Sequence, residues 1–202
     1  MTQFSQGKPM HAYLLSGARG VGKRALATRL LCALVCQSQQ KPCMGCEACK
    51  RVLDRQSPDI TWLLSPNQSI GVEPVREVLD RVGQHAFGTG YRAVVVEPAE
   101  AMTPQAQNAL LKSLEEPAAD VVFLLLSHEP SMLLPTIRSR CSQLKLTAWT
   151  DDELAETLRG KGYDEARVRA AVAVAGGNIG QALEWLEPDE QDAKIREQVS
   201  AA

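Results

Sequence analysis

The segment Gly17-Ala-Arg-Gly-Val-Gly-Lys-Arg24 decides the fold, because it places a glycine-rich turn between an apolar strand pattern and a helical pattern. Residues 12–16 before it are apolar, as in a short buried strand, and residues 24–35 after it repeat leucine with the period of a helix. In a strand–turn–helix of this kind, backbone N–H groups of the turn can surround phosphate oxygens. The candidate phosphate-binding residues are Gly17, Gly20, Gly22 and Lys23.

The end of this loop departs from the pattern of an ATPase. A serine or threonine hydroxyl that holds Mg²⁺ is required at the last position, but this chain has Arg24, whose charge would repel the ion. The strand predicted over residues 93–96 leads into Glu97-Pro98 rather than into an aspartate and a catalytic glutamate. Glu97 could replace the aspartate, whereas Pro98 cannot act as a base. The residues alone fit a phosphate cradle and a structural turn equally well, and we do not expect ATP hydrolysis.

Strand and helix patterns alternate along the first 148 residues. Further strands are expected over 59–64, 93–96, 121–126 and 143–147, and helices over 72–86 and from Pro104 to before Pro117. Strands that are apolar on both faces and alternate with helices predict a parallel α/β sheet.

The pattern of predicted secondary structure changes after Ala148. Three helical patterns begin at a Thr150-Asp-Asp-Glu153 capping box, at Asp164 and at Asn178. We therefore expect an α/β domain over 1–148, a small three-helix domain over 149–187 and a polar tail over 188–202.

Four of the six cysteines crowd into one short segment, with the spacing Cys36-x₆-Cys43-x₂-Cys46-x₂-Cys49. Short Cys-x₂-Cys turns present two thiolates at the separation that a tetrahedral zinc site requires, and four protein ligands leave no position for a reactive water. The spacing predicts a structural Zn²⁺ module inserted at about 36–49, with an iron–sulfur cluster as the chemical rival. Cys32 could compete as the first ligand, although it fits a core position better.

Composition limits the classes of function. The 202 residues are 45% apolar and 23% charged, with a net charge of −2, and no basic stripe for independent DNA binding is evident. The apolar runs are too short to cross a bilayer, and the N-terminal residues lack the apolar core of a signal peptide. A cytoplasmic protein is the expectation.

Two further segments carry a family resemblance. Asn108-Ala-Leu-Leu-Lys-Ser-Leu-Glu-Glu-Pro117 and Thr136-Ile-Arg-Ser-Arg-Cys141 resemble motifs of bacterial DNA polymerase III clamp-loader subunits, which are AAA+ proteins. The glycine-rich loop, a Cys₄ insertion and these two motifs occur in the family's order, and residues 150–187 resemble its helical lid domain. Arg24, Pro98 and Gly180 make the chain similar to the delta-prime type, because ATP-hydrolysing members carry a nucleotide-sensing arginine at the last of these positions.

The resemblance implies an AAA+-type P-loop parallel sheet with an inserted zinc module, followed by a helical lid. It also implies a role in DNA replication, in which the assembly loads the sliding clamp onto primed DNA. Expected partners are gamma/tau-type ATPase subunits, a delta-type subunit and the clamp, with no membrane. By resemblance, Arg140 is an arginine finger that acts in trans on a neighbour's ATP. We expect neither ATP binding nor independent activity in this subunit of the DNA-directed DNA polymerase III holoenzyme, a nucleotidyltransferase complex.

The chain also departs from the resemblance. Few residues precede the first strand, and residues 188–202 end where a helical collar domain would begin, so we expect a fragment or a chain that lacks the collar. Two alternatives stay open: an active gamma/tau-type clamp-loader ATPase, and a zinc-dependent nucleic-acid-binding module.

Overall fold

A parallel five-stranded sheet forms the centre of the first compact unit. A computed structural model describes residues 9–65, 69–82 and 90–187. The strands are β1 (Ala12–Ser16), β2 (Ile60–Leu64), β3 (Arg92–Glu97), β4 (Val121–Ser127) and β5 (Ser142–Lys145), in the spatial order β2-β3-β4-β1-β5. All neighbouring strands pair in parallel. The predicted parallel α/β sheet is confirmed.

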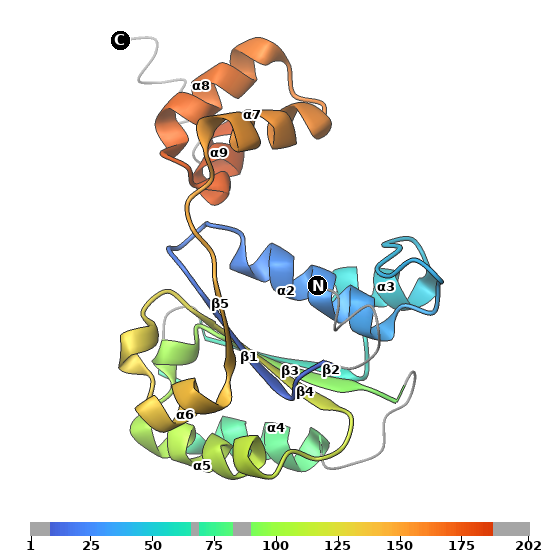
Figure 1. Ribbon diagram of the computed structural model, residues 1–202, viewed down its shortest axis with the longest axis vertical. Coiled ribbons are helices and arrows are strands. Elements are labelled where there is room, and N and C mark those ends of the chain that lie inside the picture. The colour runs from blue at the N-terminus through green and yellow to red at the C-terminus, as the bar shows by residue number, and fades with distance from the viewer. Residues whose placement is uncertain (1–8, 66–68, 83–89, 188–202) are drawn as a thin grey trace. The chain divides into compact units, whose positions relative to one another are not determined.

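Helices cover both faces of this sheet (Figure 1). Helices α2 (Lys23–Val35) and α3 (Glu47–Leu53) lie on one face, and α4 (Val72–Val82) and α5 (Pro104–Glu115) on the other. The central strand β4 is buried along its whole length, as strands between two helical layers must be. The core on the α4 and α5 face contains Leu14, Val96, Phe123 and Leu110.

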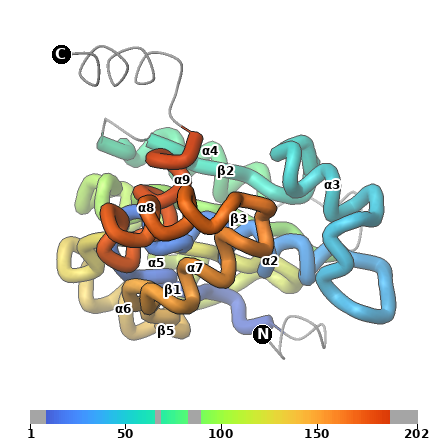
Figure 2. Tube along the Cα trace, turned by 90° about the horizontal axis from the view of Figure 1, so that it is seen from above, coloured from blue at the N-terminus to red at the C-terminus, as the bar shows by residue number. Residues whose placement is uncertain are grey.

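Two short helices were not expected from the sequence. Helix α3 lies inside the cysteine-rich segment, beside the end of α2 in both views (Figures 1 and 2). Helix α6 (Pro135–Arg140) carries the Ser-Arg-Cys motif up to its arginine. Helix α4 begins as predicted, but the expected extension to residue 86 lies outside the described residues.

The second compact unit has its own core. Helices α7 (Asp151–Gly160), α8 (Glu165–Ala175) and α9 (Ile179–Leu186) bury Leu154, Leu158 and Val168 with other apolar residues, and α8 packs against both α7 and α9 (Figure 2). The Thr150–Glu153 capping box is present, and Asp164 and Asn178 cap the next two helices. These caps satisfy backbone N–H groups of the first turns.

The two units divide the chain between Lys145 and Leu146, with one exception. Residues Gly17–Gly22 of the glycine-rich loop group with the unit that begins at Leu146. The described helices include none that is long and apolar enough to cross a membrane.

Candidate functional site

The glycine-rich loop lies at the carboxyl edge of the sheet, where ligands of open α/β sheets bind. It follows β1 directly, and Ser16 at the end of β1 is in register with Ser127 at the end of β4. Glu97 ends the adjacent strand β3. Parallel pairing therefore brings the ends of β1, β3 and β4 to one edge.

An ion pair joins the two positions that would serve Mg²⁺ in an ATPase. The Arg24 Nε donates to the Glu97 carboxylate at 2.7 Å, with the two side chains 55% and 18% exposed. Glu97, the candidate to replace the missing aspartate, is thus bound by Arg24, which stands in place of the missing hydroxyl. This direct contact leaves the Glu97 charge neutralised by protein rather than by a metal ion.

Glu100, the next acidic residue after Glu97, also contacts a residue of the protein. Glu100 Oε1 accepts from the backbone N–H of His128 at 3.1 Å and also contacts His128 Nδ1. Glu100 lies in the short 3₁₀ helix η1 (Ala99–Ala101), which follows Pro98. The arrangement ties the end of β3 to the residue after β4.

Donors from the second unit hold the loop through its carbonyl groups. Asn178 Nδ2 donates to Arg19 O at 2.8 Å, the Gly180 N–H to Gly20 O at 2.9 Å, and Trp149 Nε1 to Val21 O at 3.0 Å. Three successive loop carbonyls are thus satisfied by protein donors.

Two glycines permit this close approach. Gly20 has a φ of +73°, and a Cβ there would lie 2.1 Å from Asn178 Oδ1. A Cβ on Gly180 would lie 2.8 Å from Gly20 Cα. At Gly180, where active relatives were expected to carry arginine, the backbones of α9 and the loop meet without room for a side chain.

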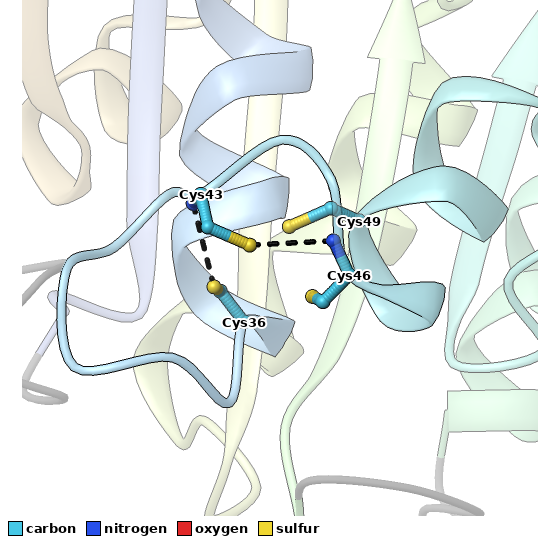
Figure 3. Close-up of side chains that lie close together, drawn as sticks. All are labelled: Cys36, Cys43, Cys46 and Cys49. Atoms are coloured by element: carbon cyan, nitrogen blue, oxygen red, sulfur yellow. Dashed lines mark hydrogen bonds between the residues drawn. The ribbon is translucent and has the colours of Figure 1, made fainter.

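The four predicted metal ligands come together in one cluster. The sulfur atoms of Cys36, Cys43, Cys46 and Cys49 all lie within 4.8 Å of one another and could hold a metal ion, and Figure 3 shows the four side chains converging. Cys36 follows the end of α2, Cys46 immediately precedes α3, and Cys49 lies in the first turn of α3. The helix ends thus supply three ligands and the intervening loop supplies Cys43.

Hydrogen bonds favour thiolates at two of these positions. A side-chain hydrogen bond with Ser38, followed by the backbone N–H groups of Gly45 and Cys46, lowers the pKa of Cys43 to about 5. Burial raises the pKa of Cys36, but backbone hydrogen bonds from Cys43 and Ser38 outweigh it, so that this pKa is lowered. Burial raises the pKa of Cys49, and a bound cation would oppose that effect.

The remaining two cysteines lie outside this cluster. Cys32 is fully buried, and its thiol approaches Cys49 O at 3.7 Å. Burial raises the pKa of Cys141 to about 11. Both behave as core thiols, as expected for Cys32.

Arg140 ends helix α6 and contacts two acceptors of its own chain. Its Nη2 lies 2.7 Å from Glu115 Oε1, and its Nη1 donates to Thr136 O at 3.0 Å. The Arg140 and Glu115 side chains are 34% and 48% exposed.

A buried glutamine connects α5 to the start of α6. Gln107 is 3% exposed, and its Nε2 donates to Met102 O at 3.0 Å and Met132 O at 3.4 Å. Its Oε1 accepts the Leu134 N–H at 2.7 Å, immediately before α6. Gln107 and Glu115 were not predicted from the sequence, because nothing near either residue signals a partner about 25 positions away. Asn178 was recognised as a cap, but its bond to the loop was not.

Comparison with known proteins gives the family. The sequence pattern described as "DNA polymerase III, delta subunit" matches residues 1–150. The DNA polymerase III subunit delta' of Pseudomonas aeruginosa is 49% identical over 138 residues, which cover 66% of this chain and 42% of the relative. The Escherichia coli subunit of the same name is 34% identical over 201 residues, covering 96% of this chain and 60% of the relative.

More distant similarities agree with the fold. Gamma and tau subunits of DNA polymerase III match at 30–36% identity. A gamma subunit-related protein from Thermotoga maritima has the same AAA+-like fold, with a TM-score of 0.59 at 20% identity, covering 96% of this chain and 64% of that one. The chain spans 42–60% of the length of its curated delta' relatives. The expected resemblance is confirmed: the chain belongs to the DNA polymerase III delta subunit family, and its curated relatives at 34–49% identity are delta' subunits.

Proposed function

We propose that this chain acts as a delta'-type subunit of a DNA polymerase III clamp loader, which does not hydrolyse ATP and assists a neighbouring ATPase subunit through Arg140. The main support for the absence of ATP hydrolysis is the Arg24–Glu97 ion pair. Phosphoryl transfer requires a Mg²⁺ ion that is held by a hydroxyl and an acid. Here a guanidinium replaces the hydroxyl and neutralises the acid.

The contacts of the loop support the same proposal. Its carbonyl groups at residues 19–21 are satisfied by Asn178, Gly180 and Trp149. Protein donors therefore support the loop conformation without a nucleotide. The gamma/tau-type alternative would need Mg²⁺ in place of the Arg24–Glu97 pair, and we do not favour it.

The proposed role of Arg140 follows from transition-state charge. Negative charge develops on the γ-phosphate oxygens of ATP as the bond to the leaving group breaks, and an arginine from an adjacent subunit can stabilise it. Arg140 ends a helix in the motif that resembles the family's Ser-Arg-Cys segment, and its side chain is one-third exposed. We assign gamma/tau-type subunits as the recipients, with a delta-type subunit, the sliding clamp and primed DNA as further partners.

We assign structural Zn²⁺ to the four-cysteine cluster. Sulfur ligands at about 2.3 Å from a tetrahedral zinc are separated by roughly 3.8 Å, which fits sulfurs that lie within 4.8 Å of one another. The hydrogen bonds that favour thiolates at Cys36 and Cys43 suit the same ion. With four protein ligands, the zinc would hold the segment between α2 and α3 and would take no part in catalysis.

Replacement of Arg140 tests the assisting role. In a reconstituted clamp loader, Arg140→Ala should lower single-turnover ATP hydrolysis at the site that Arg140 serves by about 100-fold. Arg159→Ala is a matched control, because Arg159 forms an ion pair with Glu165 and is 51% exposed. If a clamp loader with Arg140→Ala hydrolyses ATP as fast as the control, the proposed arginine-finger role of Arg140 is refuted.

A further inference from the structure

The contact between Arg140 and Glu115 joins the ends of two helices. Arg140 is the last residue of α6, Glu115 is the last residue of α5, and the two helices pack against each other. The 2.7 Å separation between Arg140 Nη2 and Glu115 Oε1 is that of a charge-assisted hydrogen bond. The other terminal nitrogen, Nη1, donates to the backbone carbonyl of Thr136. The guanidinium plane is thus fixed at two atoms.

These two contacts leave part of the guanidinium unused. Arginine carries five N–H donors in a planar fork, and the two contacts occupy two of them. Within the described part of the chain, the structure records no further partner of this side chain, which is 34% exposed. The remaining donors can bind phosphate oxygens while Glu115 and Thr136 keep their contacts.

The strength of the pair distinguishes two roles for Glu115. It could hold Arg140 away from a neighbouring ATP, or it could orient Arg140 toward it. An exposed ion pair shifts an equilibrium by about fivefold at most, whereas a transition-state donor contributes about 100- to 1000-fold to a rate. Such a pair is too weak to withhold the arginine. It is strong enough to select one orientation of a flexible side chain.

We propose that Glu115 is a positioning residue for Arg140, which fixes the plane of the guanidinium before a neighbouring subunit presents its ATP. The inference rests on the proposed function of Arg140. Arginine has many rotamers, and ordering it before the reaction removes that entropic cost from the barrier. A residue of this kind affects the rate of the chemical step rather than the affinity for ATP.

The test compares substitutions at two adjacent glutamates in the reconstituted clamp loader. Glu115→Ala should lower kcat for ATP about two- to fivefold and leave KM unchanged, because the ATP-binding groups belong to the neighbour. Glu115→Gln retains a carbonyl acceptor and should recover most of that loss. Glu116→Ala is the matched control, since Glu116 is exposed, adjacent and equal in charge, and it should hydrolyse ATP at the wild-type rate.

A double substitution separates this inference from the proposed function. With Arg140→Ala already present, Glu115→Ala should cause no further loss, because it acts through Arg140. Suppose that Arg140→Ala slows hydrolysis, whereas Glu115→Ala leaves the rate unchanged or raises it. The positioning role of Glu115 is then refuted, and the arginine-finger role of Arg140 stands. If Arg140→Ala itself has no effect, the proposed function fails. If Glu115→Ala lowers the rate by the same factor in the wild-type protein and in the Arg140→Ala variant, then Glu115 supports the fold instead.

Discussion

Arg24 shows how one side chain can change the chemistry of a site while the fold remains. The turn between β1 and α2 keeps Gly17, Gly20 and Gly22, and each of them has a positive φ. The guanidinium of Arg24 reaches Glu97 instead of leaving that acid for Mg²⁺. Under the proposed function, this contact between two side chains prevents the reaction while the fold is retained.

Gln107 shows how a single buried side chain holds a segment of the backbone in place. The three hydrogen bonds of the Gln107 side chain go to backbone groups, and two of those groups, Met132 O and Leu134 N, lie in the segment that leads to α6. A buried amide that is satisfied in this way holds the segment at a fixed distance from α5. The position of Arg140, at the far end of α6, depends on it.

We expect Gln107→Ala to lower the free energy of unfolding by about 2–4 kcal/mol, because buried backbone groups lose their partners. The unfolding midpoint in urea measures this change. Gln105→Ala is the control, since Gln105 is exposed on the same helix, and its effect should stay within about 0.5 kcal/mol. Equal midpoints for the two variants would contradict the role given to Gln107.

At the scale of elements, apolar runs predicted the strands and their order of alternation with helices. Each described strand lies within two residues of its predicted bounds. In β1, β3 and β4, burial on both faces leaves a continuous apolar signal. Helices α3 and α6 were missed because seven and six residues are too few to display a helical period. The cysteine cluster was predictable from spacing within one segment, whereas the pairs Arg24–Glu97 and Arg140–Glu115 depend on the tertiary fold.

The cysteine-rich element gives a prediction about metal. We expect about one equivalent of zinc per chain, and Cys46→Ser should lose it because a tetrahedral site needs all four ligands. Cys32→Ala should retain it, because Cys32 lies outside the cluster although it contacts Cys49. Elemental analysis of the purified variants measures the content. A chain that keeps its zinc after Cys46→Ser would contradict the ligand assignment, and iron in place of zinc would favour the rival cluster.

At the scale of the whole molecule, the chain consists of two compact units with separate cores. The loop residues 17–22 belong by their contacts to the unit that begins at Leu146, although the strand before them and the helix after them belong to the other. In an ATPase this loop would respond to nucleotide. Here Asn178, Gly180 and Trp149 bind its carbonyl groups, which agrees with the proposal that the chain assists a neighbour instead of hydrolysing ATP.

Phosphate release from Mg·ATP by the purified chain, compared with a Lys23→Ala variant, tests the central claim most directly. Because Arg24 stands where the Mg²⁺-binding hydroxyl would be and pairs with Glu97, both proteins should release phosphate only at the rate of the buffer. Lys23 is the residue that would contact the β- and γ-phosphates in a working loop. Steady release by the wild-type chain that Lys23→Ala abolishes would show that the site is an active ATPase and would contradict the account.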